Sequence, residues 1–268
     1  MTTGIMFEYE FMRNAFGAAT VVAVVAGCCG YFLVLRGQAF AGHALAHVGF
    51  TGATAAVLIG VPPLWGLVGV TVAGGVTMGA LGERLEGSDV AIGIVLAMSL
   101  GLGLLFLHFF TTSAAQATAL LFGNLLGVDG AILTALAVLA ALCLLCLAAI
   151  SRPLLFATLQ AELAEAKGVS LRLIGILFLA IVAVAIAECA QIVGVLLVFA
   201  LMVAPAATAQ HLTRSLLAGV LVSVAVALLA AWGGLTLAYY TDWPTSFWIT
   251  ALASIAYVIA SRAVPASS

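Results

Sequence analysis

Two histidines four residues apart are the side chains of this sequence best suited to chemistry. His43 and His47 lie in the run FAGHALAHVGF, residues 40–50, whose other members are alanine, glycine, leucine, valine and phenylalanine. In an α-helix this spacing puts both imidazoles on one face, about one turn apart. Neutral imidazole is a ligand for zinc, manganese, iron and nickel, and histidines also form hydrogen bonds between membrane helices. The pair therefore indicates either a metal contact or an interhelical hydrogen-bond pair.

The surrounding residues argue against enzymatic chemistry at this pair. Zinc proteases carry a glutamate after the first histidine of an H-E-x-x-H motif, where it acts as the base, and here Ala44 takes that place. The sequence also has no Walker A motif, no G-x-S-x-G motif and no glycine-rich phosphate loop. We therefore expect a protein that is not an enzyme and that does not itself hydrolyse ATP.

The composition is that of a membrane protein. Of the 268 residues, 65% are hydrophobic and 7% are charged, whereas soluble domains have about 25% charged residues. The net charge of −2 gives no indication of a nucleic-acid partner. The five cysteines all lie in apolar runs, and we interpret them as small core or lipid-facing residues: Cys28, Cys29, Cys143, Cys146 and Cys189.

Polar residues, proline and glycine divide the chain into about nine apolar runs. A transmembrane helix needs roughly 20 apolar residues, and backbone groups in hydrocarbon must bond internally, so each run predicts a helix. We expect an all-α polytopic membrane protein with about eight or nine transmembrane helices in one domain, residues 1–268. The divisions at Gly60 and Gln191 are the weakest. The predicted spans are 12–35, 42–60, 63–82, 89–110, 130–150, 171–190, 192–211, 216–236 and 246–262.

The lysines and arginines predict the orientation, because cytoplasmic loops are enriched in them. If nine spans run from an outside N-terminus to a cytoplasmic C-terminus, only Arg13 of the eight lies outside. Because the N-terminus has no basic leader, we also expect the first apolar run to remain as a helix. The cytoplasmic residues are Arg36, Arg84, Arg152, Lys167, Arg172, Arg214 and Arg262.

One cytoplasmic connection, residues 151–175, predicts a short amphipathic helix over 153–167. Pro153 is a helix-start signal and Gly168 a helix-stop signal. Such a helix either rests on the membrane surface or docks into a groove on a cytoplasmic partner. Its apolar stripe is Leu155, Leu159, Leu163 and Ala166, and its polar side is Glu162, Glu165 and Lys167.

Three further ionisable residues fall within the predicted spans. His108 and His211 lie near helix ends, where contact with the membrane interface explains them. Glu188 lies near the outer end of the sixth span. An ionisable residue inside a membrane indicates a functional site, and Glu188 is expected either to face water or to line a path for an ion.

Four stretches together resemble a known family. The segment VGVLLVFALMVAPAATAQHL, residues 193–212, closely resembles the helix that marks the permease subunits of zinc, manganese and iron ABC importers. The other three follow in the order and spacing of that family. They are LVLRGQAFAGHALAHVGFTG (33–52), DVAIGIVLAMSLGLGLL (89–105) and LLFGNLLGVDGAIL (120–133).

The resemblance implies a type II ABC-importer fold in the bacterial cytoplasmic membrane. It implies a second copy of the permease, cytoplasmic ATPase subunits that bind ATP, and an extracytoplasmic metal-binding receptor. It implies no permanently bound cofactor, only a transported divalent metal that meets His43, His47 and Glu188. It also favours the docking interpretation of the helix over 153–167, whose coupling residues would be Leu159, Glu162, Leu163, Glu165 and Gly168.

The chain departs from the family at His43. The resemblance implies an acid at that position and often a serine at Ala46, whereas His47 matches. Imidazole in place of a carboxylate shifts preference from manganese toward zinc, although a weakened site is also consistent with the change. We therefore expect a zinc importer permease, with manganese or iron as the alternative cargo. A stand-alone, ATP-independent carrier is the rival class, and it would show inverted repeats, which the sequence lacks.

Overall fold

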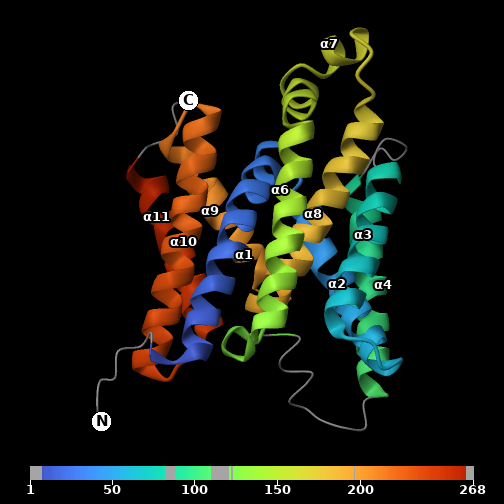
Figure 1. The fold of residues 1–268 in the computed structure, drawn as a ribbon. Helices are drawn as coiled ribbons and strands as arrows, with labels where there is room; N and C mark the ends of the chain where they lie inside the picture. The colour runs from blue at the N-terminus through green and yellow to red at the C-terminus, as the bar shows by residue number, and fades with distance from the viewer. Residues whose placement is uncertain (1–7, 82–87, 110–120, 122, 196, 264–268) are drawn as a thin grey trace.

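The computed structural model describes residues 8–81, 88–109, 121, 123–195 and 197–263. The long helices of these residues lie side by side in one bundle (Figure 1). The first helix begins at one end of the bundle, and the last helix ends at the other end, which also carries α7. In chain order the elements are α1 (Glu10–Leu35), α2 (Ala39–Leu58), α3 (Pro63–Leu81), α4 (Ser88–His108), the 3-10 turn η2 (Leu125–Gly127), α6 (Gly130–Leu159), α7 (Ala161–Ala166), α8 (Leu171–Val193), α9 (Val198–Leu212), α10 (Leu216–Thr241) and α11 (Thr245–Ala263).

The all-helical prediction is confirmed, and each predicted span contains one long helix. Within the described residues, six helices are long and apolar enough to cross a membrane: α1, α3, α6, α8, α10 and α11. The apolar parts of α4 and α9 are shorter, Ile92–His108 and Val198–Leu212. Helix α2 has 20 residues, but its two histidines lower its mean hydropathy.

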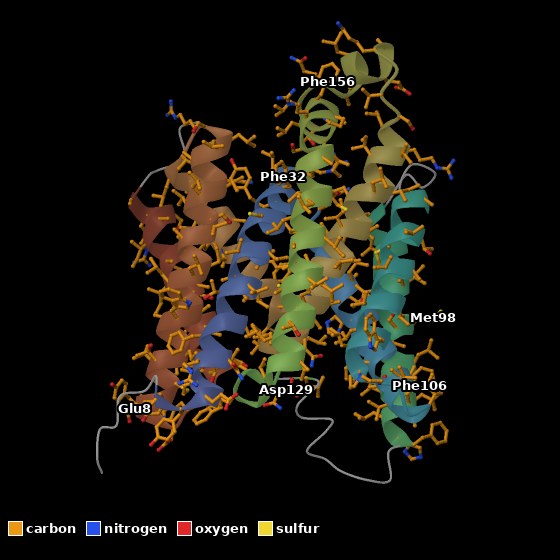
Figure 2. All side chains as sticks on the ribbon, viewed as in Figure 1. Glu8, Phe32, Met98, Phe106, Asp129 and Phe156 are labelled. Carbon is orange, nitrogen blue, oxygen red and sulfur yellow. The ribbon has the colours of Figure 1, made fainter. Side chains whose placement is uncertain are left out.

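Helices α1, α2 and α8 are the most buried long helices among the described residues. In α1 and α8, 67% of the most apolar window is buried, compared with 22–28% in α3, α6, α10 and α11. Large apolar side chains on the outer helices point away from the bundle, among them Met98 on α4, which is 67% exposed (Figure 2). An apolar exterior around a buried centre is what a helical bundle in hydrocarbon requires.

Helices α2 and α3 approach each other closely at two glycines. A Cβ atom on Gly52 would fall onto the carbonyl oxygen of Gly66, and a Cβ on Gly66 would fall onto that of Gly52. Small residues allow this approach, and packing drives helix association in membranes. The contact fixes the rotation of α2 about its axis and thereby the direction in which its histidines point.

The predicted helix over 153–167 is wrong in its boundaries. Residues 153–159 continue α6, and α7 is a separate helix of six residues. Pro153 costs α6 a backbone hydrogen bond, but the next residue, Leu154, is fully buried, and this packing continues the helix through the proline. Figure 2 shows Asp129 and Phe156 at the opposite ends of α6.

Two other boundaries differ from the predicted ones. Gly194 has a φ of 90°, a left-handed conformation that only glycine adopts easily. It ends α8, so α9 begins at Val198 rather than at residue 192. The connection 111–130, where the sequence allows a short interfacial helix, lies mostly outside the described residues. Its described part holds η2, which begins after Asn124.

Candidate metal site

The two histidines of α2 lie side by side. The ring centroids of His43 and His47 are 4.9 Å apart, and the rings are inclined at 84°. The four-residue spacing of the sequence produces this arrangement directly, because α2 is an uninterrupted helix from Ala39 to Leu58. The prediction that both imidazoles share one face is confirmed.

Burial distinguishes these histidines from the rest of α2. From Ala41 to Thr54, every residue except His43 and His47 is buried. Both imidazoles are only half-buried, and in the described part of the chain neither makes a hydrogen bond through its side chain. The histidines are therefore presented on the one open face of a buried helix, and the predicted interhelical hydrogen-bond pair is not observed there.

Two neighbours border the pair. Phe199 of α9 lies against His43, with ring centroids 5.2 Å apart and an inclination of 74°. The hydroxyl of Thr51, one turn beyond His47, donates to the carbonyl oxygens of His47 and Ser99, and this bond ties α2 to α4. The sequence contained no signal for Phe199 beyond its place in the 193–212 motif. The imidazole pair is thus bordered by Phe199 of α9, and a hydrogen bond one turn away ties its helix to α4.

Glu188 does not join the histidines. Its side chain on α8 is 0% exposed, so the expectation that it faces water is wrong. Neither carboxyl oxygen has a hydrogen-bond partner within the described residues. The described residues also contain no group of three or more His, Cys, Asp or Glu placed to hold a metal ion. The structure therefore brings His43 and His47 together and leaves Glu188 apart from them.

The remaining histidines and cysteines lie as the sequence predicts. His108 is the last residue of α4, and His211 lies in the last turn of α9, with its ring centroid 5.6 Å from that of Tyr257. Cys29, Cys143 and Cys189 are buried, whereas Cys146 is exposed. Cys143 and Cys146 therefore face different environments and do not form a C-x-x-C site.

The family model for the ABC 3 transport family matches residues 8–263. The chain belongs to this family. The family model spans almost the whole chain, and the expected kinship with metal ABC-transporter permeases is confirmed. This ABC 3 transport protein is a multi-pass membrane permease, the transport component of an ABC system rather than an enzyme.

Named relatives and a solved structure agree with this family. The manganese transport system membrane protein MntC of Halalkalibacterium halodurans is 27% identical over 95% of this chain and 88% of its own length. A probable iron transport system membrane protein of Haemophilus influenzae is 31% identical over 94% and 93%. PsaBC from Streptococcus pneumoniae in complex with Fab matches with a TM-score of 0.87 and 26% identity, covering 97% of this chain and 94% of that one.

The other candidate functional region of this ABC 3 transport protein is the tip around α7, which comprises residues 159–168. Leu159 is 70% exposed and Leu163 is 48% exposed, and Glu162 and Glu165 are also exposed. Gly168 ends the tip with a φ of 83°. Ala164 is fully buried and faces back to the bundle. The five predicted coupling residues thus form an exposed surface with apolar and acidic side chains, although not the long helix that the sequence predicts.

Proposed function

We propose that this chain is the membrane subunit of an ABC importer that carries a divalent transition metal, preferentially zinc, into the cytoplasm. The observation that carries the proposal is the pair of half-buried imidazoles on the open face of α2. A carboxylate would favour manganese at such a position, whereas imidazole nitrogen suits zinc. The manganese and iron in the names of the relatives make these metals the alternative cargo.

A second copy of the chain would complete the coordination of the ion. One copy offers only two imidazoles, and zinc commonly takes four ligands. The open face of α2 leaves His43 and His47 available to a facing copy, so that a symmetric dimer would surround the ion with four nitrogens. Such a site binds briefly, because a transport site must release its ion as well as select it.

On the path of the ion through the bundle, Glu188 would contact the metal transiently and would not be a ligand of the histidine site. Its carboxyl is fully buried without a hydrogen-bond partner among the described residues, and an unpartnered buried carboxyl is costly. Such a residue in a membrane bundle marks an ion pathway more often than a structural role. A rearrangement of the bundle that admits the ion would give this carboxyl its partner.

The membrane arrangement follows from the charges. We propose nine spans, including α2, α4 and α9, with the N-terminus outside and the C-terminus and α7 in the bacterial cytoplasm. The end of the bundle that carries α7 also carries the described residues Arg36, Arg152, Lys167, Arg172, Arg214 and Arg262. This excess of positive charge supports a cytoplasmic location of that end.

The tip around α7 would bind the ATPase subunits. The exposed Leu159 and Leu163 offer an apolar contact, and the adjacent glutamates offer charge. An extracytoplasmic receptor would deliver the ion at the opposite end of the bundle. No permanently bound cofactor is needed in this scheme, because the metal is cargo and ATP binds to the partner.

The test is uptake of ⁶⁵Zn by proteoliposomes that contain the complex purified through a tag on this chain. We expect ATP-dependent uptake that a His43→Ala/His47→Ala double variant abolishes. The matched control is His108→Ala, which removes an exposed histidine at the end of α4 and should leave uptake unchanged. Full activity of the double variant would exclude the ligand assignment, and uptake without ATP would favour a stand-alone carrier.

A further inference from the structure

Arg36 lies where three segments of the chain meet. It follows the last residue of α1, and its backbone N–H donates to the carbonyl oxygen of Phe32. Its guanidinium donates from Nε to Oε1 of Gln38 over 3.2 Å and from Nη1 to Oγ1 of Thr158 over 2.9 Å. The Cζ atom lies 5.4 Å from the ring centroid of Phe178, within the range of a cation–π contact.

Two of these partners flank the tip around α7. Thr158 is the penultimate residue of α6, and α7 begins at Ala161. Phe178 lies on α8, the helix that follows the tip, and is fully buried. The Thr158 hydroxyl donates its own hydrogen to the carbonyl oxygen of Leu154 over 2.6 Å, so it meets the guanidinium as an acceptor. Arg36 therefore holds both helices from which the tip projects.

The third partner leads to the imidazole pair. Gln38 directly precedes α2, and its carbonyl oxygen accepts the N–H of Gly42 over 3.2 Å. His43 is the next residue. Because Gln38 and His43 are linked by one hydrogen-bonded turn of the same helix, a displacement of Gln38 would move His43 with it. The guanidinium thus connects the base of the tip with the start of the helix that carries the pair.

The environment of Arg36 is unlike that of an ordinary interfacial arginine, whose charged head lies in water. The side chain is half-buried, and burial lowers the pKa of its guanidinium. Arginine nevertheless remains charged in proteins. Its planar fork allows the Nε and Nη1 bonds to be made at the same time, which the single ammonium group of a lysine does not reproduce.

We propose that Arg36 is a positioning residue that links movement of the α6–α7–α8 tip to the position of α2 and its histidines. This inference rests on the proposed function, in which an ATPase moves the tip and the pair holds the metal. The guanidinium fixes the position of α2 relative to the ends of α6 and α8 at the base of the tip. A movement of the tip therefore also moves His43 and His47. Without the Arg36 guanidinium, the ATPase continues to hydrolyse ATP, but movement of the tip no longer moves the histidine pair.

The test compares variants in the reconstituted complex by the number of ⁶⁵Zn ions taken up per ATP hydrolysed. Arg36→Gln removes the charge and the fork, and we expect this ratio to fall about tenfold, the equivalent of one charge-assisted hydrogen bond. ATP hydrolysis and equilibrium ⁶⁵Zn binding without ATP should remain within about twofold of wild type. Thr158→Val leaves the Arg36 charge in place and removes the hydroxyl that accepts its hydrogen bond. This variant should also lower the ratio.

Two controls separate coupling from folding. Arg172→Gln removes an exposed arginine at the same end of the bundle and should keep the wild-type ratio. The double variant Arg36→Gln/Thr158→Val should be no worse than Arg36→Gln alone, because both substitutions break one contact. If the complex with Arg36→Gln does not assemble, the ratio of ⁶⁵Zn uptake to ATP hydrolysis is measured for Thr158→Val and Arg36→Lys instead.

The outcomes are distinguishable. An active wild-type complex whose Arg36→Gln and Thr158→Val variants keep the normal ratio would overturn the role of Arg36 and leave the proposed function standing. Uptake and ATP hydrolysis that fall in the same proportion would show a purely structural residue and overturn it as well. A wild-type complex without ATP-dependent metal uptake would overturn the proposed function and, with it, this inference.

Discussion

The aromatic ring of Phe199 lies edge-on to the imidazole of His43, with the two ring centroids 5.2 Å apart. Contacts of this geometry contribute about 0.5–1.5 kcal/mol beyond burial. The contact limits the rotation of the His43 ring, which would otherwise be free on the open face of α2. The α9 motif at residues 193–212 therefore contributes directly to the candidate metal site.

Replacement of Phe199 by alanine should weaken the capture of metal. Without the ring, His43 samples more rotamers, and we expect the KM for ⁶⁵Zn uptake to rise about 2- to 10-fold. The maximal rate should change less, because both imidazoles remain. The KM is measured from the zinc dependence of uptake. Phe199→Tyr keeps the ring and should keep the KM, and an unchanged KM in Phe199→Ala would remove Phe199 from the site.

His43→Asp should change the choice of metal. A carboxylate oxygen favours manganese relative to an imidazole nitrogen, so we expect the ratio of manganese to zinc uptake to rise about tenfold. Competition between ⁵⁴Mn and ⁶⁵Zn in the same vesicles measures this ratio. His47→Asp is the matched variant one turn away. If neither substitution alters the ratio, the pair does not select the metal.

Acid should inhibit uptake through the same imidazoles. A metal ligand must be deprotonated, and protons compete for the nitrogen lone pair as the pH falls. Each imidazole that binds the ion adds one competing proton, so the apparent affinity should fall more steeply with acid the more histidine ligands the ion has. In His43→Asp the slope should fall to about half of the wild-type slope, because half of the imidazoles are replaced by carboxylates, which remain ionised in this range. Identical slopes for wild type and variant would contradict the involvement of His43.

The sequence predicts the structure correctly where a single local pattern decides it. The shared face of His43 and His47 follows from a spacing of four in a helix, and the spans follow from runs of apolar residues. The predictions are wrong where tertiary packing determines the structure. Pro153 is a start signal in isolation, yet burial of Leu154 carries α6 through it. Glu188 is near a helix end in the sequence, and only the packing around α8 places it in the core.

The contacts of Arg36 were also beyond the sequence. Thr158 lies 122 residues further along the chain, and no periodicity relates the two positions. Phe199 is likewise far from His43 in the sequence, and its ring contacts that imidazole only because α9 lies next to α2. Pairwise contacts between helices depend on how the bundle assembles, and the pattern of a single sequence does not contain that information.

Two exposed leucines at the tip should be required for binding of the ATPase. Leu159 and Leu163 are 70% and 48% exposed, so Leu159→Ser/Leu163→Ser should scarcely affect the fold. We expect at least about tenfold less ATPase in the purified complex, since each buried leucine contributes about 1.5–3 kcal/mol to an interface. Quantification of the co-purified ATPase measures the effect. Lys167→Ser at the same tip is the control, and normal assembly of the leucine variant would place the ATPase elsewhere.

Two glycines of α3, three residues apart, provide a matched test of the helix packing. A Cβ on Gly66 would meet the Gly52 carbonyl oxygen and lie 2.5 Å from the Ala56 Cβ, whereas a Cβ on Gly69 has nothing within 4 Å. Gly66→Ala should therefore destabilise the protein by about 1–3 kcal/mol through overpacking. Gly69→Ala should be neutral or stabilising by up to about 1 kcal/mol, because alanine is the better helix former.

Thermal unfolding of the two purified variants in detergent distinguishes these effects. We expect a lower midpoint for Gly66→Ala and an unchanged or higher midpoint for Gly69→Ala. The displacement of α2 in Gly66→Ala should also disturb the imidazole pair, so its ⁶⁵Zn uptake should fall more than the loss of folded protein explains. Equal midpoints for the two variants would mean that α2 and α3 do not meet at Gly52 and Gly66, and that the rotation of α2 is fixed by other contacts.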